Sequence, residues 1–398
     1  MSESRVSPDY GEFGPVFTFS AGPSGASPRT LAAIGKGVPY HHDPLFLDLY
    51  ASTIGQLQQA FEAPERPVIL QGEAVLGLEA AAASLIAPGD VVLNLVSGIF
   101  GKGFGYWARR YAKEVIELEV AYDSAISASQ VESALAARPD VAIVTVVHCE
   151  TPSGTMNPVH EIGPVVAAAG ALLLVDAVSS FGGMVVDPLA WHADLIVVGP
   201  HKCLGGAPGL SLLYVSDKAW EHMQANPEAP RASVLSILDW KDADGRSHPF
   251  PFTPSVVEIQ ALASCLHQYL EEGPAAVRAR HARAAHATRT GGAALGLSLW
   301  AADPSICSDT ATAFKVPNGI DEPRLRAQAR SQLGVMLSGG EGDLAGKVTR
   351  IGHMGPGAYP IGPVVALTAL GQSLRSQGFP ADVGGAVEAA VAALNERA

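Results

Sequence analysis

The chain has 398 residues, of which 48% are hydrophobic and 16% charged, so it has enough apolar material for a large buried core and is not a disordered chain. Its 26 Lys and Arg against 39 Asp and Glu give a formal net charge of −13 at pH 7, which argues against nucleic acid or an anionic membrane as a partner. The four cysteines are scattered and form no C-x-x-C pair, so neither a disulfide framework nor a zinc site is expected. The polar, acidic start is no secretory signal, and we expect a cytoplasmic protein that acts on small molecules.

The first two thirds of the chain alternate short apolar runs with helical stretches. The runs are rich in Val, Ile and Leu, which is typical of a parallel sheet that helices cover on both faces. The last run follows its predecessor so closely that we expect it to pair antiparallel at the sheet edge. We predict strands at residues 66–71, 90–97, 140–148, 171–178, 193–199 and 209–216, and helices at 75–87 and through 106–114.

After Pro254 the pattern changes. Two long helical stretches, 256–273 and 275–294, lead into short strand candidates and two closing helices, the last at 384–396. We therefore predict an α/β fold with a large domain at 16–260, a smaller α+β domain at 261–398, and residues 1–15 as an N-terminal arm. The short strand candidates are residues 297–301, 312–317 and 334–339.

Ligands of open parallel sheets bind beyond the carboxyl ends of the strands, and two residues stand out there. Asp176 interrupts an otherwise apolar strand, and a buried carboxylate needs a partner. Lys202 lies in the glycine- and proline-rich loop after the next strand, where an amine with little access to water has a lowered pKa and becomes nucleophilic. The full set of strand-end candidates is 71–75, 97–100, 148–153, 176–179 and 199–206.

An Asp at one strand end and a Lys after the next suit pyridoxal chemistry. The aldehyde forms a Schiff base with the lysine, and the carboxylate pairs with the protonated pyridine nitrogen, so the ring can accept electrons when a proton leaves the substrate carbon. Taken singly, Lys202 is more simply an exposed residue and Asp176 a helix cap. Their combination on successive strands favours the pyridoxal interpretation.

Six motifs that follow one another along nearly the whole chain resemble those of the class V aminotransferases of fold-type I. Within that family the resemblance is strongest to a branch that degrades vitamin B6, through residues 71–86, 101–111 and 250–256. It implies a mostly parallel, helix-covered central sheet and a smaller C-terminal α+β domain. The motifs are AGPS (21–24), GLEAA (77–81), HCETPSG (148–154), DAVSSFGG (176–183), GPHKCLG (199–205) and GKVTRIGHMG (346–355).

The resemblance implies a role for each matching residue. Lys202 would form the Schiff base and carry the proton, and Asp176 would pair with the pyridine nitrogen. Phe100 would stack on the ring, and Thr151 would hydrogen-bond its 3-hydroxyl oxygen. Arg350 would bind the substrate carboxylate through its bidentate fork.

Further contacts follow from the same resemblance. Phe252 and Thr253 match a segment that reaches into the neighbouring subunit's site, so we expect a homodimer or homotetramer. Core packing is the simpler interpretation of Phe100 and Phe252, and only the resemblance argues otherwise. The remaining B6 contacts would be Glu73, Ala74, Val75, Val178 and Tyr40.

Glu73 stands where phosphate-dependent relatives carry small hydroxyl and glycine residues that hold the cofactor phosphate at a helix N-terminus. Two unit charges about 4 Å apart repel by roughly 4 kcal/mol at an effective dielectric constant of 20, and a dianion by about twice that. The helix terminus returns only ~0.3–1 kcal/mol. We therefore predict that Glu73 disfavours phosphorylated B6 and accepts a hydrogen bond from the free 5′-hydroxymethyl group. Simple helix capping by Glu73 is the alternative.

The loop before Arg350 departs from the branch that the chain resembles. That branch has an additional arginine there to help hold the oxo acid, whereas this chain has Glu341. Arg350 alone should still bind one carboxylate, but more weakly, so the identity of the oxo acid stays open. A solvent-facing Glu341 without a role is the alternative.

The resemblance implies an aminotransferase that moves the amino group of pyridoxamine to a small 2-oxo acid, with pyruvate expected, giving pyridoxal and L-alanine. The B6 compound would be a substrate, and no cofactor would be permanently bound. One alternative is a pyridoxal 5′-phosphate-dependent enzyme of the alanine– or serine–glyoxylate kind that tolerates Glu73. Another is a non-catalytic B6-binding or storage protein, against which Arg350 speaks because storage needs no carboxylate clamp.

Overall fold

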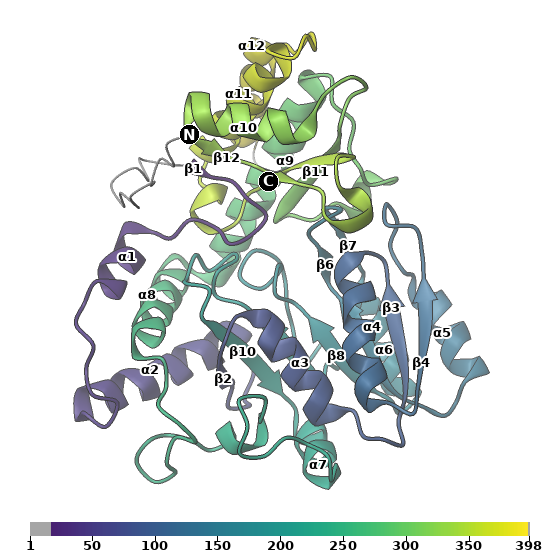
Figure 1. The fold of residues 1–398 in the computed structure, drawn as a ribbon, viewed down its shortest axis with the longest axis vertical. Helices are drawn as coiled ribbons and strands as arrows, with labels where there is room; N and C mark the ends of the chain where they lie inside the picture. Colours follow the sequence, from purple (N-terminus) through teal and green to yellow (C-terminus); the bar gives the residue numbers. More distant parts are fainter. Residues whose placement is uncertain (1–16, 397–398) are drawn as a thin grey trace, which may run out of the picture.

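A seven-stranded sheet forms the larger part of the computed structural model, which describes residues 17–396 (Figure 1). Strand β10 runs antiparallel to both of its neighbours and the other pairings are parallel, so the sheet is mostly parallel, as predicted. In spatial order the strands are β2 (Val68–Gln71), β10 (Leu210–Val215), β9 (Leu195–Val198), β8 (Leu172–Asp176), β5 (Val141–Val147), β3 (Val91–Val96) and β4 (Glu114–Glu119).

Helices cover both faces of this sheet. Successive strand side chains point to opposite faces, so that Val92 packs under one helical layer and Leu93 under the other. One layer holds α3, α4 and α7, and the other holds α2, α5, α6 and α8. Burial on both faces explains why the inner strands are mostly apolar. These helices are α2 (Pro44–Phe61), α3 (Ala74–Leu85), α4 (Ile99–Tyr111), α5 (Ala128–Ala137), α6 (Val159–Ala168), α7 (Asp217–Ala225) and α8 (Val256–Glu272).

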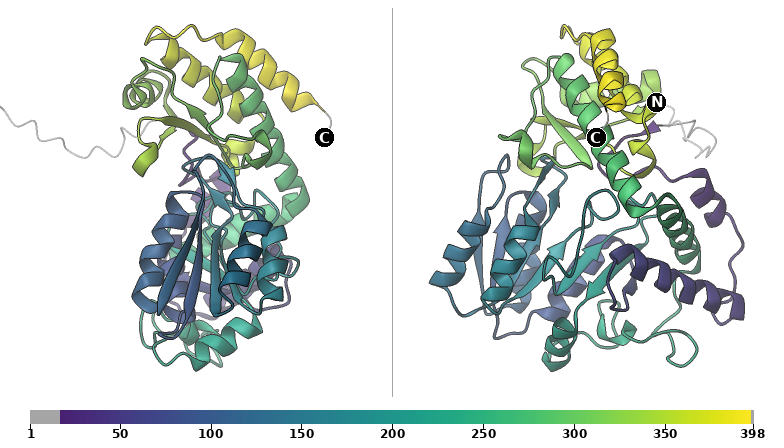
Figure 2. Two further views of the ribbon diagram at one scale, coloured as in Figure 1. Left: turned by 90° about the vertical axis from the view of Figure 1, so that its right-hand side faces the viewer. Right: turned by 180° about the vertical axis from the view of Figure 1, so that it is seen from behind.

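The C-terminal third packs around a three-stranded sheet of order β11-β14-β13, with a hydrophobic core of its own (Figure 2). The first described strand, β1 (Phe17–Thr18), pairs with β12 here. The elements of this part are α9 (Pro274–Ala294), β11 (Ala311–Lys315), α10 (Glu322–Leu333), β12 (Val335–Met336), β13 (Ser338–Gly339), β14 (Val348–Gly352), α11 (Ile361–Arg375) and α12 (Val383–Asn395). The short elements are α1 (Pro28–Ile34), β6 (Cys149–Glu150), β7 (Thr155–Met156) and the 3-10 helices Leu238–Trp240, Pro304–Ile306, Gly342–Leu344 and Gly355–Ala358.

Three local predictions differ from the structure. The helix predicted through 106–114 ends at Tyr111, and an unpredicted edge strand, β4, begins at Glu114, its apolar pattern interrupted by glutamates. Strand β10 is antiparallel, as expected, but lies inside the sheet because β2 pairs with its outer side. Residues 297–301 form no strand and contribute only an isolated bridge between Leu299 and Phe314.

The division into two domains stays a prediction. Its boundary at residue 260 falls within α8, and the expected arm at residues 1–15 lies outside the described residues. Between residues 17 and 396, no helix has the length and apolar character needed to cross a membrane.

Candidate active site

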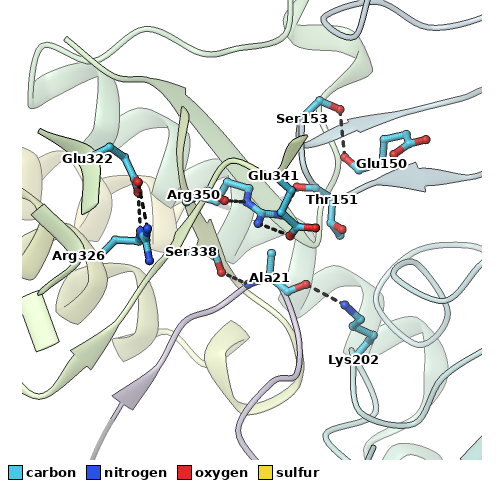
Figure 3. A network of polar contacts seen from close by, with 11 residues as sticks. Ala21, Glu150, Thr151, Ser153, Lys202, Glu322, Arg326, Ser338, Glu341 and Arg350 are labelled. Atoms are coloured by element: carbon cyan, nitrogen blue, oxygen red, sulfur yellow. Dashed lines mark hydrogen bonds and ion pairs between the residues drawn. The ribbon is translucent and has the colours of Figure 1, made fainter. Parts of the chain in front are cut away.

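Lys202 lies in a tight loop beyond the carboxyl end of β9. Its Nζ donates a hydrogen bond of 2.9 Å to the main-chain oxygen of Ala21 (Figure 3). Burial lowers the pKa of Lys202, while the negative charges of Glu73 and Asp176 act in the opposite direction. A lysine with a lowered pKa is more often neutral at pH 7, which suits a nucleophilic amine.

The AGPS motif holds this loop in place. The N–H of Ser24 donates to the main-chain oxygen of His201 at 2.8 Å, and the hydroxyl of Ser24 donates to that of Lys202 at 2.7 Å. Gly22 has a φ of +121°, and a Cβ there would lie 1.9 Å from Lys202 Nζ. Only glycine therefore leaves room for the amine.

Asp176 ends β8 and is buried. Its Oδ1 accepts a 2.9 Å hydrogen bond from the N–H of Val178, so Val178 contacts this carboxylate through its main chain. Burial raises the pKa of Asp176 to about 6, with the Val178 N–H and Lys202 opposing the rise. The group is therefore ionised at pH 7 and is suited to pair with a protonated ring nitrogen.

Glu73 caps α3 and also pairs with a histidine. Its Oε2 accepts a 2.9 Å hydrogen bond from the N–H of Val75, and its Oε1 lies 3.0 Å from Nε2 of His201, whose side chain is buried. Burial alone would raise the pKa of Glu73, but the hydrogen bonds from His201 and Val75 outweigh it and hold that pKa below its usual value. The carboxylate therefore carries its charge at neutral pH. Sequence reasoning anticipated the cap but missed His201, although His201 stands beside Lys202 in the same motif.

The first turn of α3 already has acceptors within the chain. Besides the Val75 N–H, the N–H of Leu76 donates to the main-chain oxygen of Glu73 at 2.7 Å, and the N–H of Gly77 donates to Oγ of Ser211 at 3.0 Å. An anion that binds this helix N-terminus has to compete with these acceptors. Ala74, the first residue of α3, is buried beside them.

Arg350 lies in the middle of β14 with its side chain only 4% exposed. Its guanidinium donates to the main-chain oxygens of Gly339 at 2.6 Å and Thr151 at 3.1 Å, and to Oε1 of Glu341 at 2.7 Å (Figure 3). The structure thus brings Arg350 to Thr151 through the main chain of Thr151. The expected carboxylate ligand of Arg350 is replaced here by the side chain of Glu341.

Phe100 is the second residue of α4, and Glu150 fixes its main chain. The fully buried carboxylate of Glu150 accepts hydrogen bonds from the N–H groups of Phe100 at 3.1 Å and Gly101 at 2.7 Å. Burial raises the pKa of Glu150 to about 7, against the effect of these two N–H groups. Glu150 falls within the predicted strand-end range 148–153, but no role was assigned to it there.

Three predicted residues lie apart from this cluster. Tyr40 is 66% exposed and contacts the rings of His41 and His42, and Phe252 packs edge-on against Trp240. Across residues 17–396, no hydrogen bond joins Tyr40, Phe252 or Thr253 to Lys202 or Asp176. The expected contact of Tyr40 with B6, and the expected reach of Phe252 and Thr253 into a neighbouring subunit's site, stay predictions.

The family model "Aminotransferase class-V" matches residues 54–344, a span that contains Glu73, Asp176 and Lys202. The chain is a class V aminotransferase. This aminotransferase is 54% identical to pyridoxamine–pyruvate transaminase of Mesorhizobium japonicum over 381 residues, covering 96% of the chain and 97% of that protein. It is 30% identical to serine–glyoxylate aminotransferase of Methylorubrum extorquens, with 95% and 96% covered. Its fold matches the crystal structure of pyridoxamine–pyruvate aminotransferase from Mesorhizobium loti with a TM-score of 0.94, 54% identity, and 96% and 97% of the two chains covered. The predicted fold class and the family resemblance are confirmed.

Family membership corrects one prediction. The expectation that no cofactor is permanently bound is wrong, because class V aminotransferases use pyridoxal 5′-phosphate as a bound cofactor. The described residues fit its ring, since Lys202 offers an amine and Asp176 a carboxylate that affect each other electrostatically. At the phosphate end, the N-terminus of α3 fits an anion only in competition with Glu73.

Proposed function

We propose that this aminotransferase moves the amino group of pyridoxamine to pyruvate, giving pyridoxal and L-alanine, as a step in vitamin B6 degradation. One observation carries the proposal: the carboxylate of Glu73 accepts a hydrogen bond from the Val75 N–H at the start of α3, so a phosphate has to compete with it there. Pyridoxamine has a hydroxymethyl group in place of the phosphate, and a hydroxyl can donate to a carboxylate that repels a dianion. The 54% identity to pyridoxamine–pyruvate transaminase supports the same substrates.

Lys202 and Asp176 act on the ring. The bound B6 ring supplies an acceptor for the electrons released when a proton leaves the carbon that carries the amino group. Lys202 Nζ releases Ala21, takes up that proton and returns it to the neighbouring carbon of the reacting pair. Asp176 holds the proton on the ring nitrogen by an ion pair, which burial strengthens because little water screens it.

The other residues orient the two substrates. Arg350 binds the carboxylate of pyruvate in place of Glu341. Phe100, whose main chain Glu150 holds, stacks on the ring, and the hydroxyl of Thr151 hydrogen-bonds its 3-oxygen. Ala74, Val75 and Val178 line the ring's edge, and Tyr40, Phe252 and Thr253 reach the site of a neighbouring subunit.

The experiment is a two-substrate assay of the purified protein that measures pyridoxal by absorbance and L-alanine by chromatography. We expect equal amounts of both products from pyridoxamine and pyruvate, and a much lower rate with pyridoxamine 5′-phosphate. Lys202→Ala should abolish turnover. Failure to form L-alanine from pyridoxamine would overturn the proposal.

An alanine– or serine–glyoxylate aminotransferase is the second candidate, favoured by the 30% identity to serine–glyoxylate aminotransferase. Serine or alanine with glyoxylate, assayed in the presence of pyridoxal 5′-phosphate, separates the two. If glycine forms from these pairs faster than L-alanine forms from pyridoxamine, the second candidate holds and the first is wrong.

We also infer a homodimer or homotetramer located in the cytoplasm. The location is supported by the four cysteines, which form no disulfide, because a reducing compartment keeps cysteines in the thiol form. The assembly is supported by large apolar side chains that are exposed on and between α1 and α2, where a second copy would cover them. Light scattering during gel filtration tests the assembly, and a monomer at micromolar concentration would contradict it. The exposed side chains are Leu31, Val38, Tyr40 and Leu45.

A further inference from the structure

Among the described residues, Glu341 is the only side chain that accepts a hydrogen bond from the guanidinium of Arg350. Two partners of the guanidinium, the oxygens of Gly339 and Thr151, belong to the main chain and cannot turn away. The third is the Glu341 carboxylate, whose side chain is 52% exposed although that of Arg350 is 4% exposed. Glu341 is therefore the partner that a substrate can replace.

The glycines around Glu341 let its loop pack closely against its surroundings: a Cβ on Gly340 would meet the main chain of Leu344, and one on Gly339 would meet the side chain of Glu322. Gly339, Gly340 and Gly342 surround Glu341, and Gly342 has a φ of +50°. A Cβ on Gly342 would lie 3.3 Å from Ile99, the residue before Phe100, so the loop rests on the start of α4. Even after it releases Arg350, Glu341 therefore stays at the mouth of the site.

Strand β13, which pairs with the strand of Arg350, connects Arg350 with the amine of Lys202. Ser338 lies opposite Arg350 in the sheet register, and its Oγ accepts a 2.9 Å hydrogen bond from the N–H of Ala21 (Figure 3). The oxygen of Ala21 in turn accepts from Lys202 Nζ. Arg350 and Lys202 are thus linked through Ser338 and Ala21, and Figure 3 shows Glu341 in the same network.

A fixed negative charge at this place distinguishes oxo acids by their own charge. A 2-oxo acid with one carboxylate has only to displace Glu341 from Arg350. An acid with two carboxylates also brings its second charge toward Glu341, which repels it.

We propose that Glu341 determines acceptor specificity: its ion pair with Arg350 makes this site select 2-oxo monoacids over 2-oxo dicarboxylates. This inference rests on the proposed function, because it assigns Arg350 to the oxo acid. It makes Glu341 a competitor for Arg350 and also a barrier to a second carboxylate. Glu341→Gln removes both effects and keeps the size of the side chain.

The test separates binding from turnover. In the Lys202→Ala background, which cannot react, calorimetry measures the affinities of the protein for pyruvate and 2-oxoglutarate. We expect Glu341→Gln to tighten pyruvate binding by about tenfold and 2-oxoglutarate binding by about a hundredfold, since charge effects at half-exposed groups are moderate. The control variant is Asp343→Asn, which removes an equal charge two residues away in the same loop. Asp343 is exposed, so this change should alter either affinity by less than about twofold.

Several outcomes would overturn the proposal. They are unchanged or weaker binding in Glu341→Gln, equal tightening for the two acids, or an Asp343→Asn effect as large as that of Glu341→Gln. If Glu341→Gln changes the two affinities as predicted but the wild-type enzyme makes no L-alanine from pyridoxamine, the proposed function is contradicted and the role of Glu341 stands. Steady-state assays of both acids, with Glu341→Gln and Asp343→Asn in protein that keeps Lys202, give the same comparison as KM values.

Discussion

The carboxylate of Glu73 lies 3.0 Å from Nε2 of His201, the residue directly before Lys202. This pair connects the turn that starts α3 with the loop that carries the reacting amine. With Oε2 held by the Val75 N–H, both oxygens of Glu73 are fixed beside the B6 site. Because its charge is held at this place, Glu73 is proposed to discriminate between phosphorylated and free B6.

Replacing Glu73 by Ser should tighten the binding of pyridoxal 5′-phosphate. Removing the carboxylate frees the Val75 N–H and removes a repulsion, so we expect about a tenfold gain, equal to roughly 1.4 kcal/mol. Binding of pyridoxal should become weaker because its hydroxymethyl group loses an acceptor. Titrations followed by absorbance measure both affinities.

The matched control for this change is Glu79→Gln. Glu79 lies on the same helix but pairs with Arg110 on the exterior. It should leave both affinities within about twofold. If Glu73→Ser does not raise the ratio of the two affinities in favour of the phosphate, Glu73 does not discriminate between them.

The sequence predicted six of the seven strands of the large sheet and the helices α3, α4, α8 and α9, because these have strong local patterns. It made Asp176 and Lys202 candidates by the rule that ligands bind at strand ends. It could not predict the partners that the fold brings from far away in the chain. Ala21, His201 and Glu150 have no signal in hydrophobic periodicity, since their roles depend on which loops meet. The same holds for Glu341. The sequence shows that it stands where related enzymes have an arginine, but only the structure shows its ion pair with Arg350.

Binding of pyridoxamine should weaken in acid through Asp176. Its pKa is raised to about 6, so the free protein loses this negative charge as the pH falls through 6, while the ring nitrogen of the ligand stays protonated. Affinity should be constant above about pH 7 and about tenfold lower at pH 5. Calorimetry between pH 5 and 8 measures the change.

Two variants show which group titrates. Asp176→Asn should bind pyridoxamine weakly at every pH and lose the dependence near 6. Glu150→Gln removes the other buried acid, with a pKa of about 7, and should keep that dependence. If the pH dependence disappears in Glu150→Gln and persists in Asp176→Asn, the assignment to Asp176 is wrong.

Glu150→Gln should lower both stability and turnover. An amide offers one acceptor oxygen, so one of the N–H groups of Phe100 and Gly101 loses its partner inside the protein. We expect a loss of about 1–3 kcal/mol in the free energy of unfolding. Because Phe100 then shifts, we also expect a rise in the KM for pyridoxamine, whereas the affinity for pyruvate should stay the same. Denaturant titration and steady-state kinetics measure the two effects. Unchanged stability would show that the two hydrogen bonds contribute nothing.

Gly22→Ala should disable the enzyme without touching a reacting group. A Cβ at this position would lie 1.9 Å from Lys202 Nζ, and the φ of +121° is unfavourable for alanine. We expect the rate to fall at least about a hundredfold, since a displacement of about 1 Å at a reacting group has that effect. Gly25→Ala, where a Cβ meets nothing within 4 Å, is the control and should keep the rate. Equal activities of the two variants would contradict the placement of Gly22 against the amine.

The most direct test is to reduce the protein with borohydride in the presence of pyridoxal and to locate the label by peptide mapping. The account predicts one pyridoxyl group per chain, on the peptide that contains Lys202, and none in Lys202→Ala. A label on another lysine, or a Lys202→Ala variant that still converts pyridoxamine and pyruvate at the wild-type rate, would contradict it.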